Sequence, residues 1–201
     1  MKMRIAVLVS GGGTNLQALL EAEEAGKIPH GEIAMVISNN PGAYALERAK
    51  NFGVPAACIS KKELGSQAAF EAELQAVLER NGTDLIILAG FMCILSENFT
   101  SKWPKRIINV HPALIPSFCG EGFYGLRVHE EALRYGVKVT GATVHFVNEI
   151  PDGGKIIAQK AVSIEDGDTP EILQRRVMEQ AEWILLPQAA EKVCASIKED
   201  K

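Results

Sequence analysis

The chain has 201 residues, 47% of them apolar, which is enough for one well-buried core and leaves no room for a second catalytic module. Its formal net charge of −4 lacks the basic excess that nucleic-acid-binding proteins usually show. The opening apolar stretch ends at Ser10, too early for a membrane span, and carries no signal-peptide cleavage pattern. We therefore expect a single cytoplasmic domain over residues 1–201, with neither nucleic acid nor membrane as a partner.

In its first half the chain alternates aliphatic runs with helical periodicity. The aliphatic runs are continuous, as expected of strands that are covered on both faces. This rhythm is typical of a parallel sheet built from right-handed βαβ units. The pattern predicts strands at 5–9, 33–38, 56–59, 84–89 and 107–110, and helices at 15–26, 43–52 and 70–80.

After Gly136 the pattern changes to two longer strands, at 137–147 and 155–162. The turn-prone residues Pro151-Asp-Gly-Gly154 join them, which predicts an antiparallel hairpin. A helix is expected to begin at Pro170 behind the capping Thr169, and Pro187 is expected to kink or restart it. The predicted fold is therefore α/β: an open, mostly parallel, Rossmann-like twisted sheet with helices on both faces and a C-terminal antiparallel hairpin.

The turn Ser10-Gly-Gly-Gly-Thr-Asn15 lies between the first strand and the first helix. Glycines let a backbone approach an anion, and the free amides of a helix N-terminus point at it, although glycines are also common in any tight turn. A dinucleotide fingerprint would need a glycine where Leu16 stands and an acidic residue where Ser38-Asn39-Asn40 ends the second strand. No lysine follows the glycines, as a nucleotide P-loop would require. The turn therefore favours a single phosphate group.

Asn109 and His111 lie at the end of the fifth predicted strand, where ligands of open parallel sheets bind. Strand alternation places the two side chains on the same side of the sheet. Asp152 lies in the hairpin turn and by itself is typical of a turn residue. His30, His129 and His145 show no metal-ligand spacing, and local structural roles are expected for them.

The four cysteines are far apart and form neither a CxxC pair nor a zinc-ligand spacing. They are expected to be reduced thiols, and no metal site is expected. The cysteines are Cys58, Cys93, Cys119 and Cys194.

Five segments, in this order along the chain, resemble the phosphoribosylglycinamide formyltransferase family, and the resemblance extends from Arg4 to about Pro187. The Asn-x-His-Pro element with a later aspartate is shared by the wider formyltransferase superfamily. The glycine-rich loop and the single-domain length resemble the glycinamide ribonucleotide member. The segments are Gly11-Gly-Gly-Thr-Asn-Leu-Gln17, Leu88-Ala-Gly-Phe-Met92 with Ile94-Leu95, Ile108-Asn-Val-His-Pro112, Gly141-Ala-Thr-Val-His-Phe146 and Asp152-Gly-Gly-Lys-Ile-Ile157.

The resemblance implies formyl transfer from 10-formyltetrahydrofolate, as co-substrate, to the amine of glycinamide ribonucleotide in purine biosynthesis, by a monomer or homodimer without a metal. In that chemistry Asn109 donates to the oxyanion, His111 as imidazolium moves a proton, and Asp152 favours the charged imidazole. The implied catalytic residues are Asn109, His111 and Asp152; Gly13, Thr14 and Asn15 would bind the phosphate, Glu182 the ribose, and Gln67, Met92, Cys93, Ile94, Leu95, Asn109 and Val147 the folate.

The sequence departs from this family pattern in places. Cys93 and Gln67 stand at or near positions of arginines that are associated with the acidic tail of the folate. The spacing from Arg176 to Glu182 is one residue longer, and Trp183 replaces a common histidine. Two alternatives stay open: hydrolysis of the formyl donor by water, and a phosphate- or nucleotide-sensing domain without chemistry.

Overall fold

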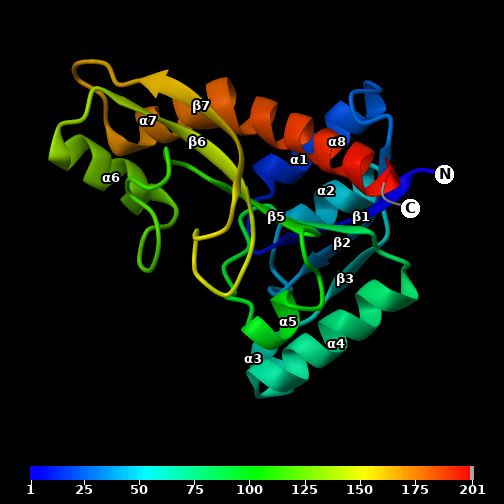
Figure 1. The fold of residues 1–201 in the computed structure, drawn as a ribbon. Helices are drawn as coiled ribbons and strands as arrows, with labels where there is room; N and C mark the ends of the chain where they lie inside the picture. Colours follow the sequence, from blue (N-terminus) through cyan, green and yellow to red (C-terminus); the bar gives the residue numbers. More distant parts are fainter. Residues whose placement is uncertain (200–201) are drawn as a thin grey trace.

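The computed structural model describes residues 1–199, and within them the chain forms one seven-stranded sheet of order β3-β2-β1-β4-β5-β6-β7 (Figure 1). The first five strands are parallel, whereas β6 pairs antiparallel with both β5 and β7. The predicted fold class is confirmed. The single domain over residues 1–201 stays a prediction, and its last two residues, 200–201, lie outside the described residues. The strands are β1 (Met3–Val9), β2 (Gly31–Ser38), β3 (Ala56–Cys58), β4 (Leu85–Leu88), β5 (Ile107–His111), β6 (Val139–Phe146) and β7 (Ile156–Ser163).

Helices cover both faces of the sheet (Figure 1). Side chains along β1 alternate between the two faces of the sheet, and each face has its own hydrophobic core. Ile5 and Val7 belong to the core under α1, α2, α7 and α8. Ala6 and Leu8 belong to the core under α4 and α5. The short helices α3 and α5 were not predicted, because each is a single turn and is too short to show a helical periodicity in the sequence. The helices are α1 (Thr14–Glu24), α2 (Ala45–Asn51), α3 (Lys61–Leu64), α4 (Gln67–Arg80), α5 (Glu97–Thr100), α6 (Leu126–Tyr135), α7 (Pro170–Val177) and α8 (Trp183–Glu199).

The strand order reverses between β1 and β4. From β1 the chain builds outward to β2 and β3, and from β4 it builds in the opposite direction to β5. In open α/β sheets the crevice at the carboxyl ends of such strands is where ligands bind. The loops after β1, β4 and β5 therefore define the edge at which a site is expected.

The C-terminal helical segment contains a π turn, η1 (Met178–Glu182), between α7 and α8. After this π turn the α-helix begins again at Trp183, before Pro187, which lies buried inside α8. The prediction that the helix restarts at Pro187 is therefore wrong by four residues. A π turn closes its hydrogen bonds over one residue more than an α turn. The π turn lies in the interval from Arg176 to Glu182, where the sequence was expected to hold one residue more than the family pattern. None of the helices in residues 1–199 is long and apolar enough to cross a membrane.

Candidate active site

The glycine loop between β1 and α1 contains three glycines in two kinds of position. Gly13 has a left-handed φ of 73°, and a Cβ there would lie 2.7 Å from Cβ of Ala45. A Cβ on Gly11 or Gly12 would meet nothing within 4 Å. Gly13 is thus required by backbone conformation and by packing against α2, whereas Gly11 and Gly12 border open space.

The first turn of α2 fixes the orientation of this loop. The Ala45 N–H donates to the Gly11 carbonyl at 3.1 Å, and Nε of Arg48 donates to the Gly12 carbonyl at 2.8 Å. Because carbonyl and N–H point in opposite directions across a trans peptide, the amides of Gly12 and Gly13 are turned away from α2. Outward-facing amides at a helix N-terminus are the geometry that binds an anion.

Glu182 and Asn15 join the glycine loop to the π turn. Glu182 is 6% exposed, and its Oε2 accepts a hydrogen bond of 2.7 Å from Nδ2 of Asn15. Burial raises the pKa of Glu182 to about 7, although the hydrogen bond from Asn15 opposes that rise. The structure therefore places the residues expected at the phosphate and at the ribose side by side.

Asn109 lies directly opposite His145 in the antiparallel pairing of β5 with β6. Nδ2 of Asn109 is 3.2 Å from Nε2 of His145, and Nδ1 of His145 donates to the Phe146 carbonyl at 2.8 Å. Nδ1 therefore carries a proton, and Nε2 lies against both the Asn109 amide and, at 3.5 Å, Oδ1 of Asp152. His145, for which a purely structural role was expected, thus orients the amide of Asn109.

Asp152 adopts a left-handed conformation with φ of 55°, in the loop between β6 and β7. The two glycines that follow it are needed for close packing: a Cβ on Gly154 would lie 1.7 Å from the Phe146 carbonyl oxygen. Oδ2 of Asp152 lies 3.4 Å from Nδ1 of His111, and Oδ1 lies 3.5 Å from Nε2 of His145. The backbone of this turn therefore brings the carboxylate between two imidazoles.

The carboxylate of Asp152 is held in its charged form. Burial alone would raise the pKa of Asp152, but the contact with His145, the charge of His111 and the N–H of Gly120 together hold it below its usual value. The Gly120 N–H donates to Oδ2 at 2.9 Å. Asp152 is thus an anion beside His111 across the neutral pH range.

His111 is 4% exposed, and its Nε2–H donates to the Phe118 carbonyl at 2.8 Å. Burial lowers the pKa of His111 and a nearby His145 adds to this, while Asp152 and the Phe118 carbonyl offset only part of the effect. The neutral imidazole therefore predominates at neutral pH, in contrast to the imidazolium expected from the sequence. Its proton lies on Nε2, and Nδ1, beside Asp152, is the nitrogen that can accept a proton.

The segment expected to line the folate pocket follows β4 and touches the glycine loop. The Met92 N–H donates to Oγ of Ser10 at 2.8 Å. Met92 and Ile94 are 54% and 67% exposed, so their apolar side chains are open to a ligand, whereas Leu95 is buried in the core beneath them. The exposed side chains of Met92 and Ile94 offer an apolar surface against which the flat ring of a ligand could pack.

The supports of this segment come from α4. Nε2 of Gln67 donates to the Ile94 carbonyl at 3.0 Å and to Glu71. Val147 and the half-buried Cys93 pack against the same core cluster. Gln67 thus holds the segment through its main chain.

Within residues 1–199 no group of three or more metal-ligating side chains of the His, Cys, Asp and Glu types gathers at one place.

Three contributors to the site were not predicted from the sequence. Arg48 approaches the glycine loop from α2, and His145 on β6 faces Asn109 on the neighbouring β5. The 118–120 segment contacts His111 and Asp152 through its main chain. The Arg48 guanidinium also lies 5.1 Å from the centre of the Tyr44 ring. A signal for His145 existed, because it lies within one of the segments that carry the family resemblance.

A glycine loop with outward-facing amides lies at the sheet's reversal point, at the same sheet edge as an amide, an imidazole and a carboxylate. This arrangement defines an α/β protein equipped for transfer of a carbonyl group. The chain belongs to the formyl transferase family, whose pattern matches residues 3–189. Its solved structural relatives include glycinamide ribonucleotide transformylase 1 from Symbiobacterium toebii. That protein superposes with a TM-score of 0.90 at 42% identity, over 97% of this chain and 89% of the other.

Two further relatives differ in how much of their own length this chain covers. The phosphoribosylglycinamide formyltransferase of Haemophilus influenzae is 41% identical over 88% of this chain and 81% of its own length. The trifunctional purine biosynthetic protein adenosine-3 of Gallus gallus is 44% identical over 96% of this chain. The chain spans 19% of the length of that larger relative.

Proposed function

We propose that this protein transfers the formyl group of 10-formyltetrahydrofolate to the amine of glycinamide ribonucleotide, a step of purine biosynthesis. The observation that carries the proposal is the cluster that Asn109, His111 and Asp152 form with His145, at the sheet edge that also carries the glycine loop. Relatives named phosphoribosylglycinamide formyltransferase and glycinamide ribonucleotide transformylase, similar along most of this chain, support it. The expected cytoplasmic location and monomeric or homodimeric state stay predictions.

The two substrates would meet at the end of β5. The phosphate of the ribonucleotide would bind the amides of Gly13, Thr14 and Asn15, and the ribose hydroxyls would reach Glu182. The folate ring would lie against Met92, Cys93, Ile94 and Val147, with Gln67 holding that segment in place. Asn109 on β5 pairs with Leu88 on β4, and the loop after β4 is bonded to the glycine loop through Ser10.

In the reaction the amine nitrogen attacks the formyl carbon, and the carbonyl becomes an oxyanion in a tetrahedral adduct. The amide of Asn109 would donate an N–H to that oxyanion, a contribution whose loss typically costs about 10²–10³ in turnover. Neutral His111 would accept the amine proton on Nδ1, and Asp152 would stabilise the resulting cation. The bond between the formyl carbon and the folate nitrogen then breaks, and the proton passes to that leaving nitrogen.

The test follows loss of the formyl donor by absorbance, with and without glycinamide ribonucleotide. Transfer predicts turnover that requires the amine. Turnover that does not depend on the amine would indicate hydrolysis, and no turnover under either condition would favour a ligand-sensing domain. Both of those results contradict the proposal.

A further inference from the structure

The loop between β5 and α6 contacts both the proposed base and its carboxylate through main-chain atoms. The Phe118 carbonyl accepts from Nε2 of His111 at 2.8 Å, and the Gly120 N–H donates to Oδ2 of Asp152 at 2.9 Å. Only Cys119 separates the two contacts. A single short peptide segment therefore holds two side chains that come from different parts of the chain.

The start of this loop is anchored to the sheet. Oγ1 of Thr143 on β6 donates to the Ala113 carbonyl at 2.7 Å and accepts from the Ile115 N–H at 3.1 Å. Nε2 of Gln159 on β7 donates to the Ile115 carbonyl at 2.9 Å. Pro116 and Ser117 are exposed and, within the described residues, make hydrogen bonds only to residues of the same loop, so Phe118 is the next residue that contacts the site.

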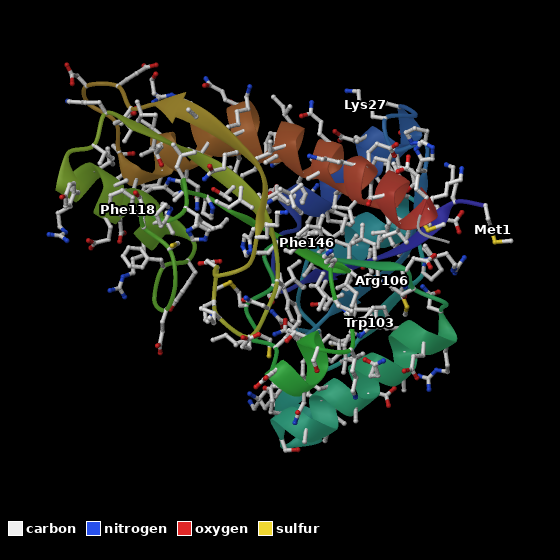
Figure 2. All side chains as sticks on the ribbon, in the orientation of Figure 1. Met1, Lys27, Trp103, Arg106, Phe118 and Phe146 are labelled. Carbon is white, nitrogen blue, oxygen red and sulfur yellow. The ribbon has the colours of Figure 1, made fainter. Side chains whose placement is uncertain are left out.

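Phe118 has a left-handed φ of 49°. That conformation is uncommon for a bulky side chain, and it persists where the surroundings hold the residue in place. Its ring lies 6.4 Å from the ring of Phe123 and 6.1 Å, edge to face, from that of Tyr135 on α6. Figure 2 shows Phe118 beside α6, at the end of the molecule away from α4.

We propose that Phe118 is a positioning residue: its ring, held by Phe123 and Tyr135, keeps the 118–120 main chain against His111 and Asp152. The effect is to fix the His111 proton on Nε2 and leave Nδ1 as the nitrogen that exchanges protons. The consequence for turnover rests on the proposed function. The positioning itself rests on the geometry alone.

The groups that act on His111 make this testable. Asp152, His145 and His129 interact with His111 electrostatically, and the Phe118 carbonyl is the hydrogen-bond partner of Nε2. Because that carbonyl raises the pKa of His111, withdrawing it lowers the pKa further. A change elsewhere in the fold that leaves in place both the 118–120 segment and the charged groups around His111 does not produce this shift.

The experiment compares Phe118→Ala, Phe118→Gly and Phe118→Tyr with Tyr124→Ala as the matched control. Tyr124 is an aromatic residue of the same loop, 57% exposed, and it makes no ring contact or hydrogen bond within residues 1–199. The imidazole pKa of His111 is measured by NMR titration without ligands. Steady-state kinetics then give kcat and KM for both substrates.

We expect Phe118→Ala to lower the pKa of His111 and to reduce kcat by roughly 10- to 100-fold, since a displacement of about 1 Å at a catalytic group can cost 10²-fold. Both KM values should stay close to those of the wild type. Phe118→Gly should behave like Phe118→Ala, because glycine accepts the backbone angle without supplying the ring. Phe118→Tyr and Tyr124→Ala should match the wild type.

A folded Phe118→Ala protein with an unchanged His111 pKa overturns the proposal. So does a Phe118→Gly protein with the wild-type pKa, because backbone conformation alone would then suffice. The NMR titration needs no substrate, so a wild-type protein that transfers no formyl group would contradict the proposed function and leave this test valid. Circular dichroism and thermal unfolding show whether each variant is folded.

Discussion

Nε2 of His145 lies 3.2 Å from Nδ2 of Asn109 and 3.5 Å from Oδ1 of Asp152, so one buried imidazole contacts two of the proposed catalytic side chains. Its other nitrogen is bound to the Phe146 carbonyl, which fixes the ring in its own strand. The amide that would meet the oxyanion is therefore oriented by a residue of the next strand, 36 residues further along the chain.

His145→Leu should remove this orientation while keeping a buried side chain of similar size. We expect kcat to fall by roughly 10- to 100-fold with little change in either KM, because misorientation of a donor affects the transition state. Steady-state kinetics measure this. His30→Leu is the control, since His30 contacts Glu191 away from the site and should retain wild-type turnover. Unchanged kcat in folded His145→Leu would show that Asn109 does not depend on it.

Gly12→Val tests the phosphate loop without disturbing its packing. A Cβ at Gly12 meets no atom within 4 Å, so the fold should survive while the side chain occupies the space where the phosphate is expected. Affinity for the ribonucleotide should fall by about tenfold or more, the cost of losing a hydrogen bond to a charged group, while folate affinity is unchanged. Calorimetry with each ligand separately measures both affinities.

Gly42→Ala supplies a matched control for that substitution, because its Cβ would meet only Oδ1 of Asn40, at an ordinary 3.5 Å. Gly13→Val is a poorer test: it would drive α2 away through the 2.7 Å contact with Ala45. If Gly12→Val weakens folate binding and spares the ribonucleotide, the two ligands have been placed the wrong way round.

Glu182→Gln should change the pH dependence of stability. The pKa of Glu182 is raised from 4.5 to about 7, so the native state binds the proton more tightly than the unfolded chain does. Wild-type stability is therefore lost as pH rises between these values, by about 3 kcal/mol at 1.36 kcal/mol per pH unit. Urea unfolding should give equal stabilities near pH 4 and a more stable Glu182→Gln protein at pH 8. Parallel stability curves for the two proteins would contradict the burial of this carboxylate.

Asp152→Asn should keep the left-handed turn, which asparagine also tolerates, and remove the charge beside His111. Because that charge raises the pKa of His111, the limb of the pH–rate profile that reports His111 should move to lower pH, and turnover should fall. The profile of kcat/KM against pH measures this. An unchanged profile with near-normal turnover would reduce Asp152 to a turn residue.

Most of the sheet was predictable, because buried parallel strands are continuous aliphatic runs such as Ile5–Val9. The shared side of Asn109 and His111 also followed from strand alternation. The role of His145 did not, since it depends on which strand pairs with β5. Arg48 and Phe118 could not be predicted for a similar reason: Arg48 donates to the Gly12 carbonyl and Phe118 accepts from His111 through its own carbonyl, and only the tertiary structure creates these contacts.

The most direct test of formyl transfer uses a donor labelled with ¹³C in its formyl group, mixed with glycinamide ribonucleotide and analysed by NMR and mass spectrometry. The account predicts that wild-type protein places the label on the amine nitrogen as a formamide. Folded His111→Ala protein should do so at a strongly reduced rate, because the proton acceptor is gone. Label recovered as free formate, or His111→Ala protein with near-normal activity, would contradict it.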